Sequence, residues 1–157
     1  MKFLAPDQFI DTLNRIYATL KERINNALPR AEVDHIGSSA IVGAISKGDL
    51  DILVRVDKTQ LEDGIKIIQG LGFEIKERTL RTESLCMLYT TEFNEDVAIQ
   101  LIARGSEFED FLRFRDRLNS NPELVAQYNQ MKLSASGYSP NEYRKIKSAF
   151  IEKVLAD

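Results

Sequence analysis

Residues 35–56 read HIGSSAIVGAISKGDLDILVRV, and this segment joins a Gly-Ser turn to a run that alternates like a β-strand. Asp49 and Asp51 are two residues apart in that run, and side chains two apart on a strand point to the same face. Both carboxylates should therefore project together, with their Cα atoms about 7 Å apart. The other face of the predicted strand is apolar and carries Leu50, Ile52, Val54 and Val56.

The residue types in this segment suit a metal-dependent phosphate site. Carboxylate pairs are typical ligands of Mg²⁺, and Mn²⁺ accepts the same oxygen donors. Gly37 has no Cβ atom, so a phosphate could approach its backbone closely, and Ser38 adds a hydroxyl group. Amides that open a following helical turn would favour an anion. Taken singly, an Asp-X-Asp pattern or a Gly-Ser turn more often marks a solvated strand face or a tight turn. In this order, they indicate a nucleotidyl transfer site with Mg²⁺ or Mn²⁺ at Asp49 and Asp51.

These motifs resemble a known signature. The set Gly37-Ser38, Gly43 and Asp49-Leu50-Asp51 is similar to that of the nucleotidyltransferase superfamily related to DNA polymerase β. More narrowly, the chain resembles the GrpB family over roughly residues 30 to 155. The matching positions in the first half are His35-Ile36-Gly37-Ser38, Lys47 and Asp51-Ile52-Leu53-Val54. Those in the second half are Phe114-Arg115-Asp116, Asn121-Pro122-Glu123, Tyr128, Lys132, Tyr143, Lys147 and Phe150-Ile151.

The resemblance implies a third catalytic carboxylate on a neighbouring strand, where this chain differs. Strand parity over 96–103 turns Val97, Ile99 and Leu101 toward the helices, so Gln100 is expected to occupy the third position. GrpB sequences usually have a histidine there, and an apolar residue where this chain has Asp49. The chain therefore has one more expected metal ligand than is typical of that family, and an amide where the superfamily has its base.

Further candidates for substrate binding come from the same resemblance. His35, Ser39 and Lys47 flank the Gly-Ser turn; Lys147 lies inside an apolar helical stripe, and Arg115 and Lys132 border such stripes. In the functional interpretation these three basic residues line the cleft opposite the carboxylates and bind a polyphosphate. In the structural one they form salt bridges, for example to Asp116. A lone histidine such as His35 is more often structural than catalytic, and Lys47 is equally interpretable as a surface lysine.

Composition narrows the classes of function. The chain has 157 residues, of which 43% are hydrophobic and 29% charged, which is ordinary for a globular protein. The net charge of −3 indicates no strong nucleic-acid signal. Cys86 and His35 are the single cysteine and histidine, so neither a disulfide nor a Cys/His zinc site is expected. No 18-residue apolar span or secretory leader is apparent, so we expect a cytoplasmic protein without a membrane segment. The sequence also lacks a serine-hydrolase elbow, a Walker loop and a dinucleotide fingerprint.

Periodicity places the elements around this segment. Helical spacing predicts helices over 6–28, 61–70 and in the C-terminal third, and alternation predicts strands over 31–36, 49–56, 73–80, 85–93 and 96–103. Short connections favour antiparallel pairing among the last three strands. Residues 57–60 and 106–109 look like capping boxes, and Asn121-Pro122 and Ser139-Pro140 like helix starts. The expected fold is α/β (α+β), a nucleotidyltransferase-like mixed sheet with helices on one face.

We expect a single domain over 1–157, with an α/β core of about 1–104 and a C-terminal helical bundle of about 105–157. The favoured function is Mg²⁺-dependent binding of a nucleoside triphosphate, with nucleotidyl transfer to an acceptor that the sequence does not identify. One alternative is an inactive nucleotide-binding or regulatory module. Another is a protein-interaction domain with a vestigial site.

Overall fold

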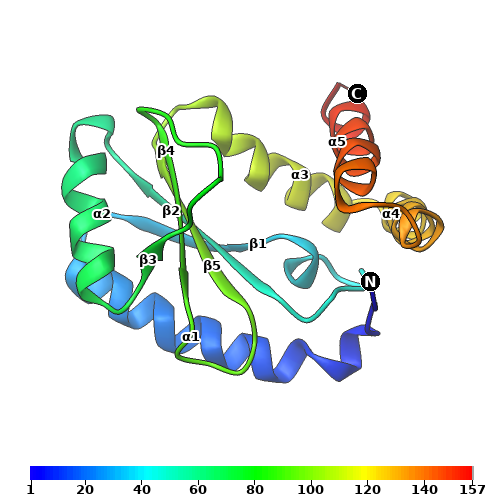
Figure 1. The fold of residues 1–157 in the computed structure, drawn as a ribbon, viewed down its shortest axis with the longest axis horizontal. Helices are drawn as coiled ribbons and strands as arrows, with labels where there is room; N and C mark the ends of the chain where they lie inside the picture. The colour runs from blue at the N-terminus through cyan, green and yellow to red at the C-terminus, as the bar shows by residue number, and fades with distance from the viewer. Residues whose placement is uncertain (157) are drawn as a thin grey trace.

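The computed structural model describes residues 1–156, which form a mixed five-stranded sheet and five α-helices (Figure 1). The sheet order is β1-β2-β5-β4-β3, with β1 Glu32–Ile36, β2 Leu50–Val56, β3 Glu74–Ile75, β4 Leu85–Thr90 and β5 Val97–Ala103. The helices are α1 Ile10–Ala27, α2 Leu61–Gly70, α3 Asp110–Asn119, α4 Pro122–Ala135 and α5 Pro140–Ala156. Short 3-10 turns lie at η1 Pro6–Gln8, η2 Ser38–Ala40, η3 Lys58–Gln60 and η4 Glu107–Glu109. The expected α/β class with a mixed sheet is confirmed.

The central pair of strands is parallel. β2 runs antiparallel to β1 and parallel to β5, and β4 and β3 continue the sheet in antiparallel fashion. The pairing aligns Asp51 with Ala98 and Leu53 with Gln100. Because partners in adjacent strands project to the same side, Asp51 and Gln100 both point away from α1 and α2. The predicted antiparallel pairing of the last three strands is confirmed.

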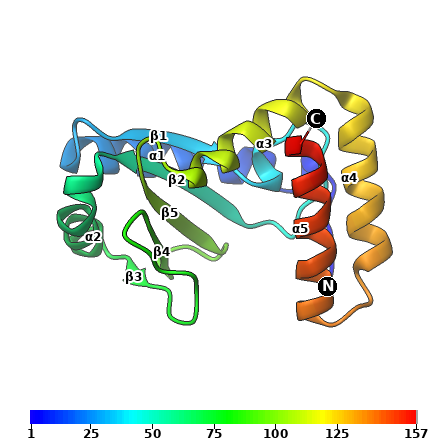
Figure 2. The ribbon, with the colours of Figure 1, turned by 90° about the horizontal axis from the view of Figure 1, so that it is seen from above.

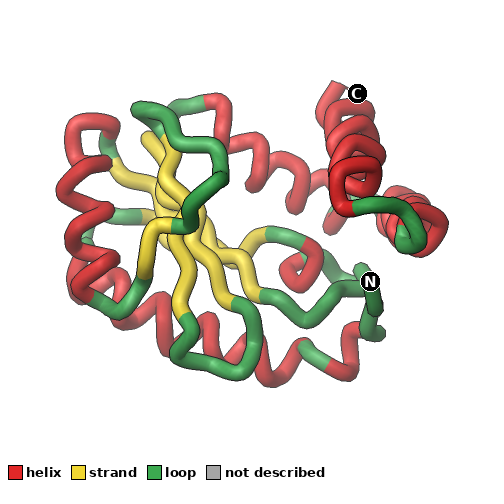
Figure 3. The backbone as a smooth tube through the Cα atoms, viewed as in Figure 1, coloured by secondary structure: helices red, strands yellow, loops and turns green. Residues whose placement is uncertain are grey.

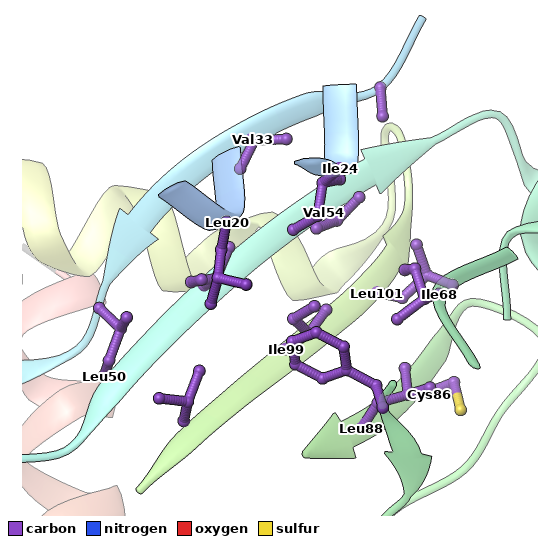
Figure 4. Packing of buried hydrophobic residues seen from close by; sticks show 14 of the residues in the cluster. Leu20, Ile24, Val33, Leu50, Val54, Ile68, Cys86, Leu88, Ile99 and Leu101 are labelled. Atoms are coloured by element: carbon purple, nitrogen blue, oxygen red, sulfur yellow. The ribbon is translucent and has the colours of Figure 1, made fainter. Parts of the chain in front are cut away.

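Helices α1 and α2 cover one face of the sheet and enclose the larger core (Figure 4). The strand residues of that core alternate with period two: Val33, Leu50, Ile52, Val54, Val56, Ile99 and Leu101. From α1, the side chains of Leu13, Leu20 and Ile24 are almost fully buried against it. Burial of one such side chain contributes roughly 1.5–3 kcal/mol, so this face anchors the strands that carry the site.

The opposite face of the sheet is also partly covered. The sequence predicted helices on one face only, and this prediction was incomplete. Leu53 and Ile102 lie on the opposite face and are fully buried. They pack with Phe108, Phe111 and Leu112 from η4 and the start of α3. Two apolar side chains on the supposedly open face require this cover, because leaving them exposed would cost hydrophobic stabilisation.

The C-terminal helices stand at the end of the sheet where β2 begins (Figure 2). Helices α4 and α5 pack side by side, and α3 links them to the sheet edge, as the tube drawing also shows (Figure 3). Their shared core contains Ile41, Ala44, Phe114, Leu118, Val125, Tyr128 and Val154. Ile41 and Ala44 come from the loop between β1 and β2, so this loop joins the two halves. Within residues 1–156, no helix combines the length and apolarity needed to cross a membrane.

Several predicted boundaries need correction. The strand expected over 73–80 is limited to Glu74–Ile75, because the residues that follow turn toward β4. The capping boxes expected at 57–60 and 106–109 do not form; each segment is a 3-10 turn without a side-chain cap bond. The predicted start of α4 is confirmed, since the Asn121 side chain accepts hydrogen bonds from the amides of Glu123 and Leu124. Ser139 Oγ likewise accepts the Glu142 amide, at 3.3 Å.

Candidate active site

The site is built where β1 and β2 meet the C-terminal helices. Gly37 ends β1 with a φ of +77°, a conformation that favours glycine. A Cβ atom on Gly37 would lie 2.6 Å from Oδ2 of Asp51, so the turn packs its bare backbone directly against that carboxylate. The backbone of Gly37 therefore lies directly beside the Asp51 carboxylate. Asp49 lies just before β2 and accepts a hydrogen bond from Ser46 Oγ at 3.3 Å.

Asp51 has an environment that resists its negative charge. Burial, followed by repulsion from the nearby carboxylate of Asp49, raises the pKa of Asp51 to about 6. Lys147, a hydrogen bond from the Gln100 side chain and Lys47 act in the opposite direction. A carboxylate held this way gains most from a cation placed beside it, because the cation offsets both burial and repulsion.

Two cavities meet at Asp51. The first, of about 440 Å³, is lined by Gly37, Asp51 and Gln100 at one end and by residues of η4, α3 and α5 along its length. The second, of about 620 Å³, lies on the other side and is lined by Lys47, Asp49, Asp51 and the loop between β4 and β5. We call them the aromatic cavity and the polar cavity. Both volumes are within the range of small-molecule sites.

Lys147 from α5 lines the aromatic cavity together with Asp51. Burial acts to lower its pKa, but the neighbouring Tyr128 and Tyr143 and the carboxylates outweigh it, so the pKa of Lys147 is raised. The side chain is therefore a stable cation at neutral pH. In the sequence, Lys147 lies inside the apolar stripe of its helix. In the structure, it lines the aromatic cavity.

Gln100 lines the inner end of the aromatic cavity, on the same face as Asp51. Its Oε1 atom is buried and has no hydrogen-bond partner among the described residues. A buried acceptor without a donor costs about 1–3 kcal/mol, so a bound cation or donor group would relieve a standing penalty. No acidic group from β5 takes this place.

Lys132 lies behind the Gly-Ser turn and not in the lining of either cavity. It is 1% exposed and donates hydrogen bonds to Ser38 Oγ at 2.9 Å and to the Ile45 carbonyl. Its Nζ atom lies 4.2 Å from the centre of the Tyr128 ring. Burial, followed by repulsion from Lys147, lowers the pKa of Lys132 to about 7. Lys132 therefore supports the Gly-Ser turn from behind and does not line either cavity.

Ser38 is held by two groups, which fixes its hydroxyl at the turn. Besides Lys132, the Tyr128 hydroxyl lies 3.1 Å from Ser38 Oγ. Sequence reasoning gave Tyr128 no role, although its position four residues before Lys132 puts both on one face of α4. Tyr128 also lines the aromatic cavity.

His35 and Ser39 pair with each other instead of facing the carboxylates. His35 Nε2 and Ser39 Oγ are 2.8 Å apart, and the imidazole stacks on Tyr17 of α1 with ring centres 5.2 Å apart. His35 pairs with Ile52 across the strands, so it lies on the α1 face. Burial, with a further contribution from Arg115, lowers the pKa of His35 to about 4, so this histidine is neutral at physiological pH.

Arg115 likewise does not line the cavities. Its guanidinium donates to the His35 carbonyl at 2.9 Å and pairs with Asp116 at 2.9 Å and Asp34 at 3.7 Å. This is the salt-bridged alternative that the sequence left open. Arg115 joins α3 to the end of β1 just before the Gly-Ser turn.

The remaining candidates lie in the polar cavity. Lys47 lines this cavity with Asp49, Asp51 and Asp96; Lys47 and Asp96 are exposed, whereas Asp49 and Asp51 are partly buried. Across residues 1–156, no three His, Cys, Asp or Glu side chains are arranged to hold a metal ion. Among the acids that line the polar cavity, Asp49 and Asp51 are close enough for Asp49 to raise the pKa of Asp51, and this pair is the candidate donor set for a cation. Two carboxylates completed by substrate phosphates are a common arrangement for Mg²⁺, so these residues fit that ion.

Comparison with known proteins places this geometry in context. A crystal structure of the Cid1 poly(U) polymerase with MgGTP bound matches with a TM-score of 0.58 at 18% identity over 83% of this chain and 42% of that chain. A cytoplasmic RNA terminal U-transferase matches with a TM-score of 0.57 over 81% of this chain and 38% of that one. At these identities the likeness shows the fold, which is nucleotidyltransferase-like. The chain spans about two fifths of these structures.

Other relatives match over nearly the whole chain. A UPF0157 protein from Vibrio cholerae is 50% identical over 155 residues, covering 99% of this chain and 82% of that protein. The crystal structure of the conserved protein GrpB from Enterococcus faecalis matches with a TM-score of 0.71 at 16% identity over 97% of this chain and 98% of that one. The family description "GrpB protein" matches residues 10–157. The chain therefore belongs to the GrpB family.

Proposed function

We propose that this protein binds a nucleoside triphosphate with Mg²⁺ and transfers its nucleotidyl group to an acceptor. The observation that carries the proposal is the position of Asp51 at the junction of two cavities. Transfer between two substrates needs two binding sites that meet at the reacting phosphate. The fold neighbours support the choice of substrate, since one of them binds MgGTP.

In this proposal the aromatic cavity holds the nucleotide. Lys147 faces the phosphates, and the bare backbone of Gly37 lets a phosphate oxygen approach without steric conflict. Asp49 and Asp51 would hold Mg²⁺, which supplies charge neutralisation at the α-phosphate. The polar cavity, with hydroxyl-bearing residues such as Thr90 and Thr91 along it, would hold the acceptor.

The reaction balances without an additional reactant. An acceptor oxygen forms a bond to the α-phosphorus while the bond to the bridging oxygen of the β-phosphate breaks, and pyrophosphate leaves. The acceptor proton passes to solvent, because Gln100 stands where the superfamily resemblance implies a carboxylate base. A positioned base commonly contributes on the order of 100-fold or more, so turnover should be slow.

This same observation favours a second candidate function. With Gln100 in place of a base, the protein could bind Mg²⁺ and nucleotide without turnover and act as a regulatory or interaction module of the same fold. Only the chemical step distinguishes the two candidates, since both need the binding site.

The decisive experiment separates binding from turnover. Calorimetric titration with nucleoside triphosphates, with and without Mg²⁺ or Mn²⁺, should show metal-dependent binding that Asp49→Asn/Asp51→Asn abolishes. Transfer of the label from an α-labelled triphosphate to a candidate acceptor, with release of unlabelled pyrophosphate, would then identify a transferase, whereas binding without transfer would identify the module. Metal-independent binding, or binding unchanged in the double variant, would contradict the site itself.

A further inference from the structure

The aromatic cavity has two chemically different ends. Its inner end carries Gly37, Asp51, Gln100 and Lys147, which the proposed function assigns to metal and phosphates. Its outer end is bounded by η4 and the start of α3 on one side and by the last turns of α5 on the other. In the proposed function the phosphates and the metal occupy the inner end. The outer end would then contact the nucleoside part of the ligand.

Apolar walls from two separate elements face each other at this outer end. Phe108 and Phe111 are half-buried on the sheet side, and Ile151 and Leu155 are half-buried on the α5 side. Aromatic side chains that remain partly open to a cavity favour a flat ring, and stacking of a base on an aromatic side chain typically contributes about 1–3 kcal/mol. The walls therefore suit a nucleobase at the far end of a bound nucleotide.

The rim of the outer end carries carboxylates that are free to accept hydrogen bonds. Glu107 from η4 and Glu152 from α5 are both exposed, and neither side chain pairs with another described residue. Asp110, the third acid of the lining, is already bound to Arg113 at 2.6 Å. Carboxylates accept and do not donate, and they repel phosphate. This rim thus orients a nucleotide with its phosphates inward toward Lys147.

The bases differ in the hydrogen-bond donors that they offer to a carboxylate. Guanine offers two adjacent donors, its N1–H and its exocyclic amino group, which match the two oxygens of one carboxylate. Uracil offers one N–H between two carbonyl oxygens, and a carboxylate repels those oxygens. We infer that the aromatic cavity is selective for guanine nucleotides, with Glu152 and Glu107 as the residues that read the base edge. This inference rests on the proposed function, because it assumes that a nucleotide occupies the cavity.

The test compares GTP with inosine triphosphate, which differs by the exocyclic amino group alone. Calorimetric titration of the full chain with Mg²⁺ should give GTP about tenfold tighter binding than ITP, as expected for a hydrogen bond to a charged acceptor, with UTP weaker still. Glu107→Gln/Glu152→Gln should weaken GTP binding more than ITP binding, because ITP keeps the N1–H donor and lacks only the amino group, so the GTP-to-ITP ratio should fall toward one. The matched control is Glu22→Gln, an exposed acid of α1 outside both cavities, which should preserve the ratio.

Each outcome separates this inference from the proposed function. Equal affinity for GTP and ITP, tighter binding of ATP or UTP, or an unchanged ratio in the double variant would overturn guanine selectivity while leaving nucleotide binding in place. Absence of binding by any triphosphate would overturn the proposed function, and this inference with it.

Discussion

Gly37 and Asp51 lie closer together than any side chain at position 37 would allow, since a Cβ atom there would stand 2.6 Å from Oδ2 of Asp51. The contact joins the Gly-Ser turn to the carboxylate at the junction of the two cavities. The turn therefore needs a glycine for two reasons. One is this close contact, and the other is the φ of +77°, which is unfavourable for other residues.

Gly37→Ala is therefore expected to displace the Asp51 carboxylate. We expect a loss of roughly 1–3 kcal/mol in the free energy of unfolding and a clear loss of Mn²⁺ affinity, measured by urea unfolding and by calorimetry. Gly72→Ala is the matched control, because Gly72 also has a positive φ, of +98°, but a Cβ atom added there would meet nothing within 4 Å. Gly72→Ala should cost stability without altering Mn²⁺ affinity. Equal metal affinity in the Gly37 variant would contradict the contact.

The raised pKa of Asp51 predicts a pH dependence of stability without metal. The pKa of Asp51 in the folded state is about 6, above its ordinary value of 3.8, so the folded state binds more protons than the unfolded one between these values. Stability from this group is present below about pH 4 and is lost as pH rises through 6. Relative to Asp51→Asn, the wild-type free energy of unfolding should fall by about 1–3 kcal/mol across this window.

Urea unfolding of both proteins at pH 4, 5, 6 and 7 checks this difference. Comparison with the variant removes the effect of His35, whose lowered pKa acts in the opposite direction in an overlapping range. Added Mg²⁺ should reduce the loss at pH 7 in wild type only. Parallel pH profiles for the two proteins would count against a buried, protonatable Asp51.

Lys132 predicts a pH dependence of the opposite sign. Its pKa is lowered to about 7 in the folded state from 10.5, so the unfolded state binds more protons between these values and stability increases as pH rises from 7. Lys132→Met should flatten this increase, on the order of 1–2 kcal/mol between pH 7 and 9, in urea unfolding. The exposed Lys145 on α5 supplies the control Lys145→Met. A slope unchanged by Lys132→Met would mean that this lysine stays charged.

Lys147→Met is expected to weaken triphosphate binding by about 10- to 100-fold, because it removes a charged donor that faces the cavity. Calorimetric titration with a triphosphate and Mg²⁺ measures this loss, and Lys145→Met should leave the affinity unchanged. Thermal melting should show a modest change, since Asp51 loses one neighbouring cation but a buried lysine is removed. A large loss of stability with unchanged affinity would assign Lys147 to a structural ion pair instead.

Local periodicity in the sequence was sufficient for the strand that carries Asp51 and for the orientation of Gln100. Strand alternation has period two and depends on neighbouring residues alone, so parity placed Asp51 and Gln100 on one face and Ile52 and Ile99 on the other. The end of α2 at Gly70 and the cap of α4 at Asn121 follow from equally local chemistry. The same parity applied to Val33 would have placed His35 on the α1 face.

The tertiary structure alone decided which basic residues face the carboxylates. In the sequence, Lys132 borders one apolar stripe and Lys147 lies inside another, and the functional interpretation assigns both to the same polyphosphate site. In the structure Lys132 is enclosed behind the Gly-Ser turn, whereas Lys147 opens into the aromatic cavity. Their difference depends on how α4 and α5 dock against the loop between β1 and β2, a contact between segments some 90 residues apart. The cavities depend likewise on η4 and α5 meeting the end of the sheet. Long-range packing of this kind is set by shape and burial over the whole chain, which no local pattern encodes.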